Sequence, residues 1–509
     1  MLRSTVLLSL ITLISYLISL VTQLSIAYYF GTSKELDIFI LSSSVPTLIG
    51  GVISSALSFS LIPYLIKKKE QIGFDYANYV IFFIKNIIKL AFFCAIVLLV
   101  GFHFFFKSLY PAMSASEHLN ASWVFLLFTI NFFFGVLIGF GNAYHNANKT
   151  YVIPLSINSL PYFLTIVIIY FFQNIFGILS IAIGQLLGSI IILIILYWKI
   201  PLRTKDASQS KFKIEFKDYI STLKYALVAM LCFTFFQTSD SYWAFNLGSS
   251  NLSYLSYNQR LIIAIGSLII AGPTTLLIPG LTKLNLIEGK IDFYKKTSEI
   301  ITLVFSIASL FAVIVSVFSK QLIEFIFQRG AFSLHDTIAV SNLLPKMLIG
   351  MVFMLCVVVL FRIMFIDKKN EQAALVGLLC AFFYFCLSGF FSSIFGVVGI
   401  AYSYFSTWVI IFFISIFFLF WGRLNLIFNF KSLKFLTYNL ISLTCVYIFI
   451  SSLFNLFDTG QILYEYSNVY VVIPILGVFS ILLYYTLMIF LFREKLILSF
   501  YNKIRIKNF

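Results

Sequence analysis

The chain has 509 residues, of which 61% are hydrophobic and only 11% are charged, and its formal net charge is +16. A typical soluble domain is about 45–50% apolar and about 25% charged, so these figures exclude a water-soluble enzyme, a disordered chain and a collagen. The apolar runs are long and unbroken, which excludes an outer-membrane barrel with its alternating strands. The sequence therefore predicts an all-α polytopic membrane protein.

Windows of about 20 apolar residues define the expected transmembrane helices in chain order. The first follows Arg3 and is longer than the apolar region of a cleaved signal peptide, so we expect it to stay in the protein. About fourteen spans are predicted, at residues 5–29, 38–66, 79–106, 121–144, 152–172, 175–198, 222–247, 253–282, 298–319, 337–366, 372–393, 397–421, 435–456 and 467–492.

Basic residues are distributed unequally between the two sides of the predicted membrane. Of the 35 Lys and Arg residues, 26 fall on the side that holds both termini, 4 on the other side and 5 within spans. Because cytoplasmic loops carry the excess of Lys and Arg, we expect both termini in the cytoplasm. The positive charge therefore mostly sets topology, and no nucleic-acid partner is predicted.

Nothing in the sequence suggests a metal site or an enzyme. The six cysteines lie inside apolar runs without ligand spacing, and the four histidines are scattered. The loops contain no clustered carboxylates, nucleophile elbow or Gly-rich phosphate loop. We therefore predict no metal and no covalent chemistry.

A short pattern occurs twice at matched spacing. Gly31 is followed 32 residues later by Pro63 within Leu-Ile-Pro, and Gly248 is followed 31 residues later by Pro279 within the same triplet. Six spans separate equivalent points, which predicts a parallel repeat of two six-helix lobes. The expected units are an N-lobe at 1–200, a C-lobe at 201–425, and a C-terminal helix pair with a basic tail at 426–509.

Charged side chains inside spans are costly in a bilayer and mark functional sites by default. Asp240 and Arg260 flank the turn at Gly248, at depths of about 12 Å and 18 Å along their helices. They form either a structural pair or part of a central cavity. Arg362 either snorkels toward lipid head groups or serves function.

The first span also carries polar side chains on one helix face. Ser19 and Thr22 continue a face that begins at Thr12 and Ser15, and Gln23 is adjacent. A polar face of this kind serves either tight helix packing or a water-filled path.

Several short segments, in order along the chain, resemble the MurJ/MviN-type lipid II flippases of the multidrug/oligosaccharidyl-lipid/polysaccharide exporter superfamily. These segments are Tyr29–Gly31, Glu35–Phe39, Val45–Leu48, Phe59–Pro63, Asn142–Tyr144, Lys149–Pro154, Tyr257–Leu261, Phe327–Phe332, Leu360–Phe365 and Gly396–Ala401. The resemblance implies two lobes, two further helices that form a groove for a lipid tail, and a cationic central cavity for a diphosphate and sugars.

The resemblance also implies roles for single residues. Arg260 matches the family's conserved arginine and Asp37 its aspartate after the first span. Asp240 matches a carboxylate often found in the seventh span, and Ser388 and Ser392 match polar residues of the eleventh. A coupling cation, Na⁺ or H⁺, is implied at these last three residues.

Some family residues are replaced in this chain. The arginine-bearing pattern of the family's first span corresponds to Tyr16, Ser19, Thr22 and Gln23, and two arginines of its second span correspond to Gly50 and Gly51. The cavity is therefore expected to be less cationic. An O-antigen or capsule lipid-linked oligosaccharide flippase stays open as an alternative, followed by a cation-coupled drug or metabolite antiporter.

We expect a monomeric flippase of the bacterial cytoplasmic membrane that moves a polyprenyl-diphosphate-linked saccharide, similar to lipid II, by alternating access. Arg260 would contact the diphosphate, because a guanidinium forms forked, charge-assisted hydrogen bonds to phosphate oxygens. The residues expected to bind or pass the substrate are Arg260, Gln259, Thr22, Gln23, Ser19, Asp37 and Arg362.

Overall fold

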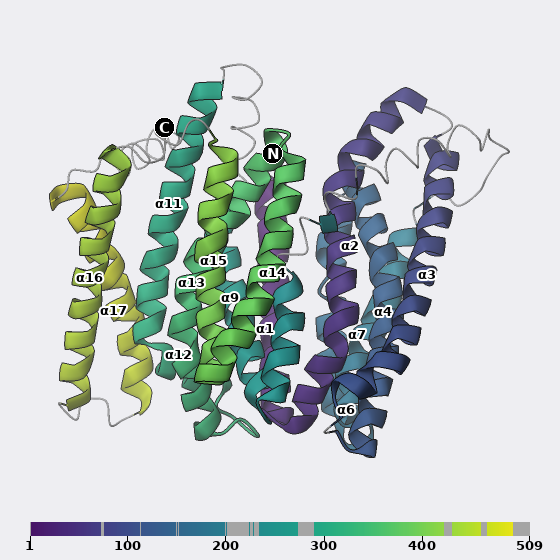
Figure 1. The fold of residues 1–509 in the computed structure, drawn as a ribbon, viewed down its shortest axis with the longest axis horizontal. Coiled ribbons are helices and arrows are strands. Elements are labelled where there is room, and N and C mark those ends of the chain that lie inside the picture. The colour runs from purple at the N-terminus through teal and green to yellow at the C-terminus, as the bar shows by residue number, and fades with distance from the viewer. Residues whose placement is uncertain are drawn as a thin grey trace. The chain divides into compact units, whose positions relative to one another are not determined.

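The fold is taken from a computed structural model that describes residues 2–72, 76–111, 113–148, 150, 152–198, 200, 223, 227–228, 234–272, 290–421, 430–459 and 466–491. Helices account for the regular structure of this part of the chain, in which no strand occurs (Figure 1). The all-α prediction is therefore confirmed.

Among the described residues, the first half of the chain contains seven labelled helices and an unlabelled helical segment at residues 234–246. The labelled ones are α1 (Leu2–Phe30), α2 (Lys34–Ile72), α3 (Tyr76–Leu109), α4 (Ala115–Ala147), α5 (Val152–Ile157), α6 (Leu160–Phe176) and α7 (Leu179–Trp198). We refer to the unlabelled segment as helix 234–246.

The second half continues with longer helices and one short one. They are α9 (Asn251–Gly272), α11 (Lys290–Val317), α12 (Ser319–Phe327), α13 (Leu334–Ile366), α14 (Asn370–Phe395), α15 (Val397–Leu419), α16 (Phe430–Thr459) and α17 (Tyr466–Thr486), followed by a short π-helix, Leu487–Leu491.

Every predicted span overlaps a helix, at least in part. Ten helices of the described residues are long and apolar enough to cross a membrane, and Ile14–Phe30 and Ile473–Ile489 are shorter apolar helices. Parts of 222–247 and 253–282 lie outside the described residues, as do the second copy of Leu-Ile-Pro and the basic tail. The chain is thus a membrane protein with many apolar helices, and the number fourteen stays a prediction.

The expected span at 152–172 is built differently from a single helix. It consists of α5 and α6, which are separated by a turn at residues 158–159. Pro161 lies in the first turn of α6, where a backbone N–H has no acceptor within the helix, so the lack of an N–H in proline costs no hydrogen bond. The short helix α12 was not predicted, because it lies in the connection after an expected span.

The chain divides into two compact units. The first contains residues 1–256, 329–333 and 377–392, and the second contains 257–328, 334–376 and 393–509. This division does not test the two lobes expected from the repeat, which stay a prediction.

Within the first unit, α2, α3 and α4 run side by side and enclose an apolar core (Figure 1). Small residues allow close helix contacts: a Cβ at Gly139 of α4 would lie 2.9 Å from the hydroxyl of Ser54 on α2. A Cβ at Gly184 of α7 would lie 2.5 Å from the Cα of Thr165 on α6. Small residues at helix contacts are typical of proteins that pack inside a bilayer.

Within the second unit, α13 packs between α11 and α15, and α16 packs on α11 beside α17 (Figure 1). A buried polar contact joins α11, α16 and α17. The hydroxyl of Tyr484 shares a short hydrogen bond with the hydroxyl of Ser306 and donates to Asn439 Oδ1 at 2.8 Å. The predicted C-terminal helix pair is therefore anchored to α11 by hydrogen bonds as well as by apolar contacts.

Candidate functional site

The two copies of the sequence repeat form turns of similar construction. Gly31 ends α1 with φ +53°, and Gly248 follows helix 234–246 with φ +122°. Both values lie in the left-handed region, which glycine adopts without steric cost. Each turn is followed within a few residues by the start of a membrane-length helix, α2 or α9.

Asp37 joins these two turns. Its buried carboxylate accepts hydrogen bonds from the backbone N–H of Ser250, from the backbone N–H of Ser253 at 2.8 Å, and from the hydroxyl of Ser253. The hydroxyl of Ser250 donates to the carbonyl of Thr32 at 2.7 Å. The carboxylate thus caps the N-terminus of α9, where a negative charge meets exposed N–H groups and the positive end of the helix dipole.

A third segment contacts the first turn. The N–H of Ala331 donates to the carbonyl of Tyr28 at 2.8 Å. Gly330 has φ +60°, and a Cβ there would overlap the carbonyl oxygen of Tyr28, while a Cβ at Gly31 would lie 2.5 Å from the carbonyl oxygen of Ala331. The glycines of two separate sequence segments therefore allow backbones to approach closely.

Asp240 lies buried in helix 234–246 and has a partner that the sequence did not reveal. The hydroxyl of Tyr384 on α14 donates a short hydrogen bond to Asp240 Oδ1, and the ring of Tyr384 stacks on Phe236 with centroids 3.9 Å apart. Tyr384 precedes Ser388 by one helical turn, so a polar face with a four-residue interval is the signal that points to it.

The two serines expected near Asp240 lie on the same helix as Tyr384. The hydroxyl of Ser388 is fully buried and makes no hydrogen bond with the described residues. Ser392 donates to the carbonyl of Gly389 at 3.1 Å. In the described part of the chain, no cluster of three or more His, Cys, Asp or Glu side chains could hold a metal ion. One carboxylate with neutral oxygens suits a monovalent cation or a proton better than a divalent metal.

Arg260 lies on α9, after Asn258 and Gln259. The Asn258 amide donates to the carbonyl of Val340 at 3.1 Å, which fixes one face of α9 against α13. Gln259 and Arg260 are half-buried, and Nη1 of Arg260 is enclosed by protein. Arg362 is half-buried on α13. Asp240 belongs to the first unit, whereas Arg260 and Arg362 belong to the second.

The polar side chains of α1 differ in their surroundings. Thr22 is buried, and its hydroxyl donates to the carbonyl of Ile18 at 2.8 Å and contacts that of Tyr162 on α6 at 3.1 Å. Oε1 of Gln23 is buried without a hydrogen-bond donor among the described residues, and Ser19 is half-buried. Thr22 therefore helps α1 to pack on α6, and contact of these residues with substrate stays a prediction.

Comparison with known proteins agrees with the family resemblance of these segments. The family model for the lipid II flippase MurJ matches residues 26–467. The chain is 26% identical over 370 residues to a probable lipid II flippase MurJ of Buchnera aphidicola subsp. Baizongia pistaciae (strain Bp), which covers 69% of this chain and 70% of that protein.

Two solved structures share the fold. A lipid II flippase MurJ in an inward closed conformation has a TM-score of 0.76 and 18% identity, covering 96% of this chain and 100% of that one. An inward-facing multidrug resistance MATE family transporter of the MOP superfamily has a TM-score of 0.61 and 14% identity, and the match covers 80% of this chain and 98% of that one. Since the family model covers most of the sequence, the chain belongs to the lipid II flippase MurJ family.

Proposed function

We propose that this protein moves a polyprenyl-diphosphate-linked saccharide, lipid II or a close relative, from the inner to the outer leaflet of the bacterial cytoplasmic membrane. Both termini lie in the cytoplasm in this proposal, in accord with the 26 basic residues on that side. The protein acts as a monomer and performs no covalent chemistry. Membership of a flippase family supports this assignment.

The observation that carries the proposal is the placement of Arg260 on α9, a 22-residue helix. Its guanidinium is half-buried, with Nη1 enclosed by protein. A charged side chain inside a predicted span marks a functional site by default. In our proposal a diphosphate accepts forked hydrogen bonds from Arg260, Gln259 contacts the attached sugars, and Arg362 adds positive charge on the path.

Transport proceeds by alternating access, with the contact around Asp37 as part of the closure on the outer side. In the proposed orientation, the turns at Gly31 and Gly248 face outward. The hydrogen bonds from Ser250 and Ser253 to Asp37 hold these turns together while the substrate enters from the cytoplasm. Opening to the outside would break them, so Asp37 affects translocation through the turns as well as through any contact with substrate.

Coupling to a cation is proposed at Asp240. The carboxylate and the buried hydroxyl of Ser388 would provide oxygen ligands for Na⁺ or a site for H⁺, with Ser392 one turn further along α14. Tyr384 holds the carboxylate in place through its hydrogen bond. Binding at this site would bias the protein toward one of its two access states.

The substrate can be tested by reconstituting the purified protein into vesicles with three compounds, each supplied separately. They are fluorescent lipid II, an undecaprenyl-diphosphate oligosaccharide of the O-antigen type, and a cationic drug. We expect the two diphosphate lipids to be moved and the drug to be left behind. Preference for the oligosaccharide over lipid II would fit the replacement of family arginines by Tyr16, Thr22, Gly50 and Gly51 and would correct the substrate. Transport of the drug alone would refute the proposal.

A further inference from the structure

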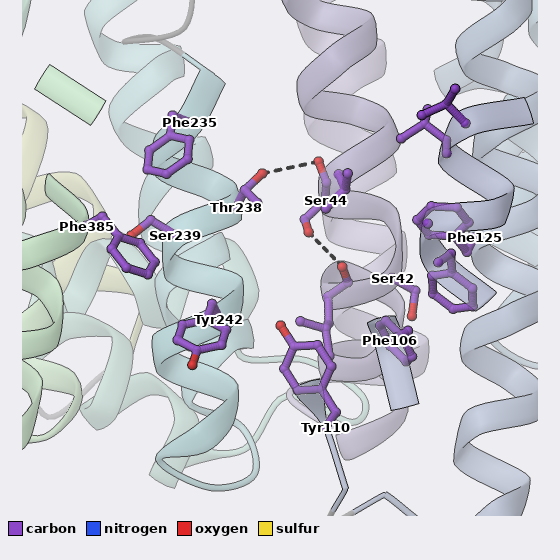
Figure 2. A pocket seen from close by; sticks show the side chains of 16 residues that line it. Ser42, Ser44, Phe106, Tyr110, Phe125, Phe235, Thr238, Ser239, Tyr242 and Phe385 are labelled. Atoms are coloured by element: carbon purple, nitrogen blue, oxygen red, sulfur yellow. Dashed lines mark hydrogen bonds between the residues drawn. The ribbon is translucent and has the colours of Figure 1, made fainter. Parts of the chain in front are cut away.

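A cavity in the first unit is formed by side chains outside the proposed substrate path. Its volume is about 560 Å³, within the range of pockets that hold small molecules. Figure 2 shows helix 234–246 on one side of it and α2 on the other. The lining residues are Leu41, Ser42, Ser44, Val45, Val97, Leu98, Gly101, Phe102, Phe106, Tyr110, Phe125, Phe235, Thr238, Ser239, Tyr242 and Phe385.

The cavity is uncharged and largely aromatic. None of its sixteen lining side chains carries a charge, and seven are Phe or Tyr. The hydroxyls of Ser42 and Ser44 donate to carbonyls of their own helix, and that of Thr238 contacts the carbonyl of Ser44 at 3.4 Å. Three of the six lining hydroxyls are thus bonded within the protein, whereas that of Ser239 has no partner among the described residues. The absence of charge argues against a diphosphate, and the mainly apolar lining favours a hydrocarbon occupant.

The two ends of the cavity differ in polarity. Tyr110 and Tyr242 lie together at one end, with ring centroids 6.3 Å apart, and Phe235 lies toward the other (Figure 2). Burial, and secondarily the neighbouring Tyr242, raises the pKa of the Tyr110 hydroxyl, so that this hydroxyl stays a neutral donor. The two phenol hydroxyls gather at one end only, beside Phe106, which matches the order of head group and tail in a lipid leaflet.

The cavity lies at a similar depth on α2 and on helix 234–246. Ser42 and Ser44 follow the start of α2 by about 12–15 Å, and Thr238 and Tyr242 precede Gly248 by about 9–15 Å. In the orientation proposed above, all these positions fall in the outer half of the membrane. Three lining residues, Val45, Val97 and Phe385, are 37%, 54% and 38% exposed, so the cavity is accessible from the bilayer.

We propose that this cavity binds a stretch of the substrate's polyprenyl chain after the head group has crossed the membrane. The inference rests on the proposed function and extends it, because it assigns a tail site in the first unit, apart from the C-terminal helix pair. The diphosphate and sugars would remain beyond Tyr110 and Tyr242, while the chain packs among the phenylalanine rings.

The choice of the substrate's chain over a bulk phospholipid follows from the absence of a hydrophobic driving force inside a bilayer. Moving a hydrocarbon chain from lipid into an apolar cavity gains only packing contacts. A free phospholipid is therefore held weakly. The tail of a substrate whose head group is already bound is presented at a high effective concentration, as is any tethered ligand.

Gly101 allows a direct test, because it lines the cavity and a Cβ there meets nothing within 4 Å. Gly101→Leu would occupy the cavity without a backbone clash, and leucine favours a helix more than glycine does. Gly135→Leu is the matched control: Gly135 lies on α4, also has open space around its Cβ, and does not line the cavity.

The measurement is photo-crosslinking in vesicles with an undecaprenyl-diphosphate saccharide that carries a diazirine in its tail, followed by mass spectrometry of the labelled peptides. We expect labelling of segments 97–110 and 235–242 in the wild type and in Gly135→Leu, and labelling reduced by about tenfold or more in Gly101→Leu. A parallel sample with a diazirine-bearing phosphatidylglycerol should label these segments weakly.

Two outcomes would overturn the inference. Equal labelling of Gly101→Leu and wild type would show that the chain binds elsewhere, and stronger labelling by the phospholipid probe would assign the cavity to a bulk lipid. Transport of lipid II measured on the same vesicles separates this inference from the proposed function. Wild-type transport without labelling of the cavity would refute the tail site alone, whereas absence of any transport would refute the proposed function.

Discussion

At the scale of single residues, the buried acids Asp37 and Asp240 have different hydrogen-bond partners. Asp37 accepts three hydrogen bonds from the start of α9, and Asp240 accepts one from Tyr384. The sequence predicted both acids because a carboxylate inside an apolar run is conspicuous. It did not reveal Tyr384, because a tyrosine is ordinary in a chain with 29 of them, and only its distance along the helix from Ser388 distinguishes it.

Replacing Asp37 by alanine tests the capping role. The substitution leaves the N–H groups of half-buried Ser250 and buried Ser253 without this acceptor, at a cost of about 1–3 kcal/mol for the buried group. We expect a lower midpoint of thermal unfolding in detergent. The control is Glu35→Ala, since Glu35 is an exposed acid two residues away. Equal midpoints for the two variants would contradict the capping role.

Replacing Asp240 by asparagine tests the proposed coupling site. The amide retains the size of the side chain and an oxygen for Tyr384, but it loses the charge that attracts a cation. We expect the transport rate to become independent of imposed Na⁺ and H⁺ gradients. Tyr384→Phe keeps the carboxylate and should keep a gradient dependence. If Asp240→Asn responded to the gradients as the wild type does, Asp240 would not be the coupling residue.

At the scale of elements, hydropathy located the helices and turn chemistry located their ends. Gly31 and Gly248, identified from the repeat, both end helices in a left-handed conformation. A single sequence does not show which turns contact one another. The backbone hydrogen bond between Ala331 and Tyr28, for example, joins residues about 300 positions apart and needs no particular side chain. The break between α5 and α6 was likewise hidden in a continuous apolar run.

Gly330→Ala tests the close approach to Tyr28. The added Cβ would be strained by the positive φ, which costs about 1–2 kcal/mol, and would also overlap the Tyr28 carbonyl. Gly396→Ala is the control, because Gly396 has the same φ of +60° but open space around its Cβ. We expect Gly330→Ala to lower the unfolding midpoint more than Gly396→Ala. Equal effects would indicate that the contact with Tyr28 adds nothing.

Tyr484→Phe tests the anchoring of the C-terminal helices. The change removes the hydroxyl that bonds to Ser306 and Asn439, and a hydrogen bond between membrane helices contributes about 0.6 kcal/mol, with a maximum of about 1.7 kcal/mol. We expect a modest fall in the free energy of unfolding. Tyr485→Phe, at the adjacent and less buried tyrosine, should have a smaller effect. A reversed order would contradict the anchoring.

At the scale of the whole molecule, composition and charge were sufficient to predict the fold class. A chain that is 61% hydrophobic belongs in a bilayer, where only helices and closed barrels satisfy all backbone hydrogen bonds. The compact units were not predicted. Segments 329–333 and 377–392 join the first unit through contacts such as those of Ala331 and Tyr384, which the repeat does not encode. The cavity beside α2 also has no sequence signal, since it is the space left between common phenylalanines.

The central claim, that this chain moves a diphosphate lipid which Arg260 binds, is tested most directly by measuring lipid II transport in vesicles that contain wild-type protein, Arg260→Lys or Arg260→Ala. We predict a rate lower by about tenfold or more for Arg260→Ala and an intermediate rate for Arg260→Lys, because lysine keeps the charge but not the forked geometry. Folding and insertion are checked by gel filtration and protease protection. Full transport by correctly inserted Arg260→Ala would contradict the claim.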